Sequence, residues 1–215
     1  MACMASSADR GSAESHRYFL SRRTVLEMLQ DRGYDVVHHA NLASSLNEFR
    51  SRFGQKPNPQ TLGFRVSHLC HPSNTVVVQV VFTGTDAIKK GTVTEIYSQI
   101  VDRQNLKGLI LVVQSNMTPY ARKDLENSPF KVEMFQINDL LVNITKHVLQ
   151  PKYEVLTEDE KKALLTKYSL EDKQLPFMLK GDAIARYYGY EKGQVIKITH
   201  SGPLVESCIT YRCVV

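Results

Sequence analysis

Tryptophan is absent from this 215-residue sequence, and cysteine occurs only four times. Cys3, Cys70, Cys208 and Cys213 lack the short paired spacing of zinc and redox motifs, so we expect free thiols in a reducing compartment. No apolar run approaches the ~20 residues that cross a bilayer. The first residues also lack the apolar core of a secretory signal. We therefore expect an intracellular protein that makes no contact with membranes.

Motifs that cradle a nucleotide are also missing. A dinucleotide site places several glycines between the first buried strand and the following helix, whereas this sequence has only Gly84 there. A metal-dependent nuclease pairs an acidic residue with a lysine on a neighbouring strand, and Glu133-Met-Phe135 occupies that place without a lysine. Both absences argue against an enzyme and against a small-molecule substrate. A metal-dependent nuclease on an α/β fold that acts on DNA remains the alternative from a different class.

One group of metal-binding residue types is present. His68, Cys70 and His71 follow a predicted strand, and His38 and His39 lie upstream. Alternation along a strand puts His68 and Cys70 on one face, but a structural zinc site needs four ligands in tetrahedral geometry. We therefore interpret these as ordinary residues at the end of a strand, and we expect no metal and no other cofactor.

The composition that is present is that of a globular protein. Hydrophobic residues make up 42% of the chain and charged residues 23%, which excludes a collagenous or wholly disordered chain. The net charge of +5 permits contact with nucleic acid without requiring it. Residues 1–146 have 17 basic and 13 acidic side chains, whereas residues 147–215 have 10 and 9. An anionic partner is therefore expected to meet the first part.

The chain begins with a polar segment and a helix. Residues 1–14 are small, polar and aperiodic, and we interpret them as a disordered tail. A helix is predicted over 14–32, where Tyr18 and Leu29 belong to one apolar face. Arg22 interrupts that face, and we expect its guanidinium to extend past it to water.

Sheet and helix signals then alternate up to residue 146. Strand–helix–strand–helix–strand order at these lengths indicates parallel strands joined by crossover helices. We therefore predict an α/β domain over 15–146, with a βαβαβ order, a largely parallel sheet and flanking helices. The predicted strands are 62–67, 76–82, 109–113 and 131–136, and the predicted helices include 44–53, 93–100 and one that begins near 119.

The pattern changes at about residue 147. Thr157 and Glu160 have the spacing of a capping box before a helix at 161–168. We predict that residues 147–215 form a small α+β domain, which at about 70 residues should be stable only when it docks on something. The remaining predicted elements are a short helix at 182–189 and strands at 194–199 and 208–214.

One turn has the features of an anion-binding site. Thr118 suits a helix N-cap and Pro119 the first helical position, just beyond the carboxyl end of the 109–113 strand. Open α/β sheets bind ligands at that edge, and a helix start offers N–H groups and partial positive charge. Arg122 and Lys123 add charge, although cations weaken a helix in its first turn. A DNA phosphate is the natural ligand, and an ordinary capped helix with surface charges is the other interpretation.

The last domain is rich in residue types that anchor interfaces. Arg186, Tyr187, Tyr211 and Arg212 fall within a small predicted surface, and aromatic and arginine side chains are the usual anchors of protein interfaces. For most other positions of this domain, the interpretation remains that they only support the fold.

Several motifs occur together along the chain. The C-terminal ones are Gln174-Leu-Pro176, Asp182-Ala-Ile-Ala-Arg-Tyr187, Gly193-Gln-Val-Ile-Lys-Ile198 and Thr210-Tyr-Arg212. The earlier ones are Asp31-Arg-Gly-Tyr34, Leu111-Val-Val-Gln114, Asn116-x-Thr-Pro119 with Ala121, and Leu141-Val-Asn-Ile144. Over about residues 15–215 this pattern resembles the fifth, shared-type subunit of eukaryotic nuclear RNA polymerases.

The resemblance implies a non-catalytic polymerase subunit in the nucleus. Residues 15–146 would be its jaw domain, which flanks the entering downstream double-stranded DNA, and the family's DNA-facing turn falls on Thr118-Pro119. Residues 147–215 would be its assembly domain, which anchors to the largest subunit of the polymerase beside the other subunits. The implied anchoring residues are Arg186, Tyr187, Gly193, Gln194, Tyr211 and Arg212.

The chain also departs from the usual pattern of this family. The usual Leu-Pro-Arg-Ile is Leu175-Pro-Phe-Met178, the usual Asp-Pro is Asp182-Ala183, and Tyr120 replaces a small residue after Thr-Pro. A copy shared by several polymerases would be constrained by all of them. The departures therefore resemble the specialised isoform of plant RNA polymerase V, which serves RNA-directed DNA methylation. A free regulator that binds transcription factors through the jaw is a third possibility.

Overall fold

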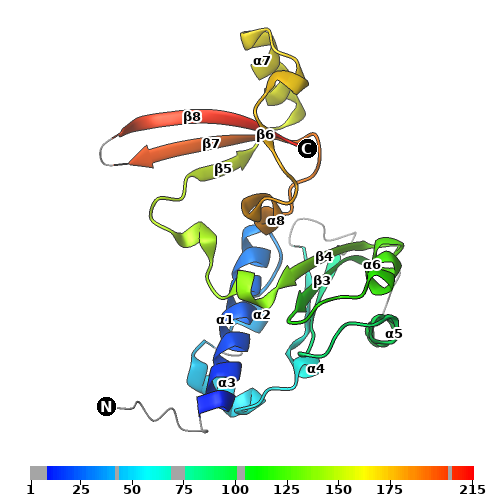
Figure 1. Ribbon diagram of the computed structural model, residues 1–215. Helices are drawn as coiled ribbons and strands as arrows, with labels where there is room; N and C mark the ends of the chain where they lie inside the picture. The colour runs from blue at the N-terminus through cyan, green and yellow to red at the C-terminus, as the bar shows by residue number, and fades with distance from the viewer. Residues whose placement is uncertain (1–8, 42–43, 69–75, 101–104, 203–204) are drawn as a thin grey trace, which may run out of the picture. The chain divides into compact units, whose positions relative to one another are not determined.

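The computed structural model describes residues 9–41, 44–68, 76–100, 105–202 and 205–215 (Figure 1). The chain divides into two compact units, an N-terminal unit of residues 1–142 and a C-terminal unit of residues 143–215. No helix in the described ranges combines the length and the apolar character needed to cross a bilayer. Each unit is described by itself below.

The N-terminal unit is an α/β domain around a four-stranded sheet. The strands lie in the order β1-β2-β3-β4, with β1 antiparallel to β2, and β2, β3 and β4 parallel. The predicted βαβαβ order and largely parallel sheet are therefore confirmed. The elements are α1 (Asp9–Asp31), α2 (Val37–Ala40), α3 (Leu46–Phe53), α4 (Pro59–Leu62), β1 (Phe64–Ser67), β2 (Val77–Phe82), α5 (Lys90–Gln99), β3 (Leu106–Val113), α6 (Pro119–Glu126), β4 (Lys131–Gln136) and the 3-10 turn η1 (Ile137–Leu140).

Helices cover both faces of this sheet, as Figure 1 shows, with α5 and α6 on one side and α1 on the other. Leu109 and Leu111 of β3 are fully buried in the core that includes α5 and α6. On the α1 side, the ring of Tyr18 packs edge-on against Phe82 of β2, with 6.3 Å between centroids. Because both faces are covered, β2 and β3 are nearly continuous apolar runs.

Helix α1 begins earlier than the sequence pattern indicates. Residues 9–14, which we assigned to a disordered tail, belong to α1, whereas residues 1–8 lie outside the described residues. The side chain of Ser15 is fully buried and accepts a hydrogen bond from Nε of Arg50 on α3, at 3.0 Å. This tertiary contact stabilises the start of the helix, and apolar periodicity alone could not have indicated it.

The expectation that Arg22 reaches water is wrong. Its side chain is only 4% exposed, and its guanidinium lies over the rings of Phe53 on α3 and Phe64 on β1. The chain after α1 folds back over this position, so the arginine is enclosed among aromatic rings.

The C-terminal unit is a small α+β domain, as predicted. Its sheet has the order β5-β7-β8-β6, with β5 and β6 at the edges. The predicted capping box is present at α7, where Thr157 accepts from the N–H of Glu160 and the Glu160 carboxylate accepts from the N–H of Thr157. The elements are η2 (Ile144–Lys146), β5 (Lys152–Val155), α7 (Glu158–Tyr168), η3 (Asp172–Gln174), β6 (Phe177–Met178), α8 (Ala183–Tyr188), β7 (Val195–Gly202) and β8 (Val205–Val214).

The C-terminal unit starts at Asn143, whereas we expected the boundary between 146 and 147. Asn143 caps η2 through the N–H of Thr145, and its side-chain amide donates to the hydroxyl of Tyr187 at 3.1 Å. Ile144 also packs against the core of this unit. These contacts join residues 143–146 to the C-terminal unit.

Candidate nucleic-acid interface

The start of α6 has the predicted capping geometry. Thr118 is extended, with φ −69° and ψ 149°, and its hydroxyl oxygen accepts a hydrogen bond from the N–H of Ala121 at 3.4 Å. Pro119 occupies the first helical position and has no N–H to satisfy. Among the described residues, Tyr120 is the one in this turn whose N–H has no partner. The helix therefore presents one free N–H and its positive dipole end to solvent.

The turn before α6 is held against the loop after β2. The N–H of Thr118 donates to the carbonyl of Ile88 at 3.1 Å, and its hydroxyl donates to the same oxygen at 3.3 Å. In return, the N–H of Ile88 donates to the carbonyl of Asn116 at 3.2 Å. Because β2 and β3 are parallel neighbours, both loops leave the same edge of the sheet. The starts of α5 and α6 are consequently fixed beside each other.

This arrangement brings two further cations to the edge. Lys89 and Lys90 open α5 and are exposed, and the ammonium of Lys90 lies 3.6 Å from a carboxylate oxygen of Asp124 on α6. Arg122 and Lys123 are also exposed. Sequence reasoning missed the lysine pair, although a Lys-Lys sequence after a buried strand was the signal that could have found it. The edge gathers four cationic side chains around one neutralising carboxylate.

The chemistry of this edge suits phosphate and not base recognition. Exposed lysine and arginine side chains neutralise backbone phosphates, whereas base reading needs side chains that enter a groove at defined positions. Tyr120, which is 79% exposed, is the one aromatic residue there. We call Thr118, Pro119, Arg122 and Lys123, with Lys89 and Lys90, the basic edge.

Glu133, the carboxylate of the nuclease alternative, is engaged in ion pairs. Its oxygens lie 2.8 Å from a guanidinium nitrogen of Arg32 and 3.4 Å from the ammonium of Lys131. The Arg32 and Glu133 side chains are 11% and 19% exposed. A carboxylate neutralised in this way ties the turn after α1 to β4, and that is a structural role.

The histidines of the possible metal cluster have other contacts. The His68 ring packs edge-on against Tyr34, with centroids 5.0 Å apart, and Nε2 of His39 is 2.9 Å from the carbonyl of Arg65. Cys70 and His71 lie outside the described residues. Within the described ranges, no group of three or more His, Cys, Asp or Glu side chains could hold a metal ion.

In the C-terminal unit, the predicted interface residues differ in accessibility. Tyr187 is 4% exposed, and its hydroxyl accepts from Asn143 as described above, so its ring belongs to the core and offers no contact surface. Arg186, on the same helix, is half-buried. The rings of Tyr187 and Tyr188 are 5.1 Å apart, and Tyr188 stacks on Tyr190 at 5.4 Å. This tyrosine cluster rigidifies α8 and the turn after it.

Gly193 and Gln194 form the turn that leads into β7. Gly193 has φ +89°, a left-handed conformation that favours glycine, and its carbonyl accepts from the ammonium of Lys161 at 3.1 Å. The side-chain oxygen of Gln194 accepts from the N–H of Glu191 at 2.8 Å. Both residues therefore act first as turn formers.

Tyr211 and Arg212 lie on opposite faces of β8. Tyr211 packs against the core cluster around Leu164, whereas Arg212 is exposed. The edge strand β6 adds an apolar surface that sequence reasoning did not select, because Phe177 is 56% exposed and the adjoining Leu179 is 68% exposed. Exposed apolar side chains next to a sheet edge are typical of a docking surface.

These two surfaces define a class of protein. One unit has a basic edge whose charge would suit an anionic polymer, and the other has exposed apolar side chains beside a sheet edge. Glu133, His39 and His68, which carried the alternatives of a nuclease and a metal site, are engaged in structural contacts. Surfaces of this kind are typical of proteins that work through contacts with other macromolecules.

Comparison with known proteins gives the family. A model of the RNA polymerase Rpb5 N-terminal domain matches residues 12–100, and a model of the RNA polymerase Rpb5 C-terminal domain matches residues 142–214. This chain belongs to the Rpb5 family of RNA polymerase subunits and, like other members of that family, it is an accessory, non-catalytic subunit. The resemblance carried by the sequence motifs is thereby confirmed.

Individual relatives are similar along nearly their whole length. The chain is 47% identical over 212 residues to DNA-directed RNA polymerase V subunit 5A of Arabidopsis thaliana, covering 99% of this chain and 94% of that protein. It is 47% identical over 208 residues to DNA-directed RNA polymerases IV and V subunit 5B of the same plant, covering 97% and 94%. It is 37% identical over 210 residues to DNA-directed RNA polymerases I, II, and III subunit RPABC1 of Caenorhabditis elegans, covering 94% and 97%.

Proposed function

We propose that this chain is a subunit of a plant-type nuclear RNA polymerase V that serves RNA-directed DNA methylation. The observation that carries the proposal is the 47% identity, over 99% of the chain, to a subunit named for polymerase V. Identity to the relative named for polymerases I, II and III is 37%. The other subunits of that polymerase, its largest subunit included, are the protein partners, and the nucleus is the location.

The basic edge supports a role in guiding downstream double-stranded DNA. Its four cations are exposed, and the positive end of the α6 dipole lies among them. Cations of this kind contact phosphates and make binding depend on salt without adding sequence preference. The N-terminal unit then acts as a jaw that follows the duplex by its backbone.

The apolar edge of β6 supports anchoring to the largest subunit. Phe177 and Leu179 are exposed beside a two-residue strand that pairs only with β8 in the described sheet. A unit of about 70 residues buries a modest core, and a partner that covers these side chains would stabilise it. Arg186, Tyr211 and Arg212 are the polar and aromatic side chains available to this contact, and Tyr187, Gly193 and Gln194 hold its framework.

Purification of a tagged copy from plant nuclei tests the assignment. Mass spectrometry of the recovered complex is expected to find the largest subunit of polymerase V. Recovery of the largest subunit of polymerase II alone, or of no polymerase subunit, would contradict the proposal.

The same purified complex tests the basic edge. Arg122→Ala together with Lys123→Ala should reduce the slope of log binding constant against log salt by about 2, since each lost phosphate contact removes about 0.9. Lys162→Ala with Lys173→Ala, two exposed lysines of the C-terminal unit, removes the same charge and should leave the slope unchanged. Equal slopes for wild type and the Arg122/Lys123 variant would exclude the basic edge as a DNA contact.

A further inference from the structure

Arg22 is a buried cation without a carboxylate partner. It lies on the apolar face of α1, 4% exposed, with its guanidinium carbon 5.1 Å from the ring centroid of Phe64 and 5.8 Å from that of Phe53. Among the described residues, no acidic side chain pairs with it. Buried charges are usually paired, so this arrangement is costly for the fold.

The hydrogen bonds of Arg22 are incomplete. Nη1 donates to the carbonyl of His39 at a long distance of 3.4 Å, and Nε has no partner in the described part of the chain. Burial, with a further contribution from the nearby charge of Arg52, lowers the pKa of Arg22 from 12.5 to about 10. An incoming anion beside the guanidinium would offset this repulsion.

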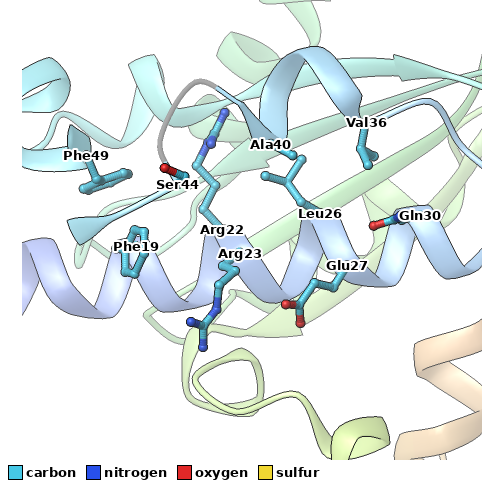
Figure 2. Close-up of a pocket in the computed structure, with 10 residues that line it drawn as sticks. All are labelled: Phe19, Arg22, Arg23, Leu26, Glu27, Gln30, Val36, Ala40, Ser44 and Phe49. Carbon is cyan, nitrogen blue, oxygen red and sulfur yellow. The ribbon is translucent and has the colours of Figure 1, made fainter. Parts of the chain in front are cut away.

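A pocket lies directly beside this side chain. It has a volume of about 230 Å³, and the Arg22 side chain extends from α1 towards Ala40 and Ser44 within it (Figure 2). The apolar lining residues Phe19, Leu26, Val36 and Phe49 are buried, whereas the polar lining residues Arg23, Gln30 and Ser44 are exposed. We call it the Arg22 pocket, and its residues are Phe19, Arg22, Arg23, Leu26, Glu27, Gln30, Val36, Ala40, Ser44 and Phe49.

The shape and charge of the Arg22 pocket favour one kind of ligand. Its volume is below the ~300 Å³ at which pockets for drug-sized molecules begin, so it suits one or two side chains. Phe19, Leu26 and Phe49 provide apolar contact, and the guanidinium provides a planar fork that fits a carboxylate. Glu27 on the lining disfavours a more highly charged group such as phosphate.

We propose that the Arg22 pocket binds a carboxylate side chain of a partner protein, a glutamate or aspartate with an apolar neighbour in the sequence. The carboxylate accepts from the Nη atoms of Arg22, and the apolar neighbour packs against the rings of Phe19 and Phe49. None of the lining residues belongs to the basic edge or to β6, so the pocket gives the N-terminal unit a protein partner in addition to those of the proposed function.

Nuclear magnetic resonance on the full chain tests the contact directly. The probe is the tripeptide acetyl-Leu-Glu-Leu-amide, and its glutamine counterpart is the control. The Nε–H resonance of Arg22, identified by its loss in Arg22→Lys, should shift and saturate with the glutamate peptide only. Equal shifts with both peptides, or with inorganic phosphate at the same concentration, would contradict a carboxylate site.

Variants separate the pocket from general charge. Arg22→Met should weaken binding of the glutamate peptide about 10-fold or more, the effect expected for a charged hydrogen bond. Arg17→Met removes the same charge from an exposed position of α1 and should leave binding unchanged. Ala40→Leu fills the pocket while keeping Arg22, and it should also abolish binding. This variant keeps the test valid in the case that Arg22→Met perturbs the fold. Unchanged binding in Ala40→Leu, or equal losses in Arg17→Met and Arg22→Met, would overturn the proposal.

Discussion

Replacement of Glu133 by alanine tests whether this carboxylate has a structural role. The side chain joins β4 to α1 through Arg32 at 2.8 Å and contacts Lys131 at 3.4 Å. Glu133→Ala removes both contacts and leaves the charge of Arg32, 11% exposed, without this carboxylate. The N-terminal unit should lose stability, and no nuclease activity should be gained or lost.

The size of the loss follows from the burial of the pair. Exposed pairs contribute at most about 1 kcal/mol, whereas breaking a fully buried pair costs about 3–5 kcal/mol. Side chains that are 11% and 19% exposed lie between these limits, and about 2 kcal/mol is the expected cost. For a unit of 142 residues this corresponds to a fall in melting temperature of about 6–8 °C.

Circular dichroism melts of the full chain measure this, with Glu95→Ala as the matched control. Glu95 is an exposed residue of α5, and its loss should change the melting temperature by no more than about 1 °C. A double-mutant cycle with Arg32→Met isolates the pair and should give a coupling of about 1–2 kcal/mol. A coupling of zero, or DNA cleavage with Mg²⁺ that disappears in Glu133→Ala, would refute the reasoning.

Two further predictions concern the C-terminal unit. Ser169 ends α7 in the left-handed region, at φ 52° and ψ 44°, so Ser169→Gly should raise the free energy of unfolding by about 0.5–1 kcal/mol in urea titrations, and Ser169→Ala should not. Burial, with Tyr188 and Tyr153 close by, raises the pKa of the Tyr190 phenol above its ordinary 10.0. Above pH 10 the unfolded chain loses this proton while the folded chain keeps it, so stability falls as pH rises. Tyr190→Phe should reduce that fall between pH 9 and 11, and an unchanged profile would contradict the assignment.

The central elements could be predicted because their patterns are local. The apolar runs at 76–82 and 109–113 allow little besides buried strands, and they became β2 (Val77–Phe82) and β3 (Leu106–Val113). Capping residues are equally local, which is why Thr118 and Thr157 were correctly expected at the starts of helices.

The short edge elements could not be predicted in this way. Strand β6 (Phe177–Met178) has two residues and exists because β8 offers it hydrogen bonds, from the N–H of Cys213 to the carbonyl of Pro176 and from that of Val215 to the carbonyl of Met178. Neither periodicity nor propensity of two residues indicates a strand. The same holds for β5 (Lys152–Val155), whose partner β7 lies about forty residues further along the chain.

In the candidate site, too, some features could be predicted from local sequence and others depend on pairing between distant segments. The start of α6 followed from two adjacent residues, Thr118 and Pro119, but the positions of Lys89 and Lys90 beside it depend on the parallel pairing of β2 with β3 and on the Ile88–Met117 bridge. Tyr187 was expected at a surface because of its residue type. In the structure Tyr187 is buried, because its ring packs in the core of its own unit and its hydroxyl accepts from Asn143. These contacts come from residues distant in sequence, so the residue type alone could not indicate them.

In three places the N-terminal unit has charged side chains where they cost stability, either buried or near the positive end of a helix. These places differ in how far neighbouring groups offset that cost. Arg32 and Glu133 are largely buried but neutralise each other at 2.8 Å, so their cost is met within the fold. Arg122 lies near the start of α6 and opposes the helix dipole, whereas Lys123 lies in its last turn, and Asp124 of the same helix forms an ion pair with Lys90. Arg22 is buried against two aromatic rings and donates one long hydrogen bond, but it has no carboxylate beside it in the described residues. Natural sequences tend to break local rules at functional sites, so this incompletely compensated charge is the one where a further partner is expected to bind. By this reasoning Arg22 requires a ligand more strongly than the basic edge does, although the basic edge is the more visible feature of the sequence.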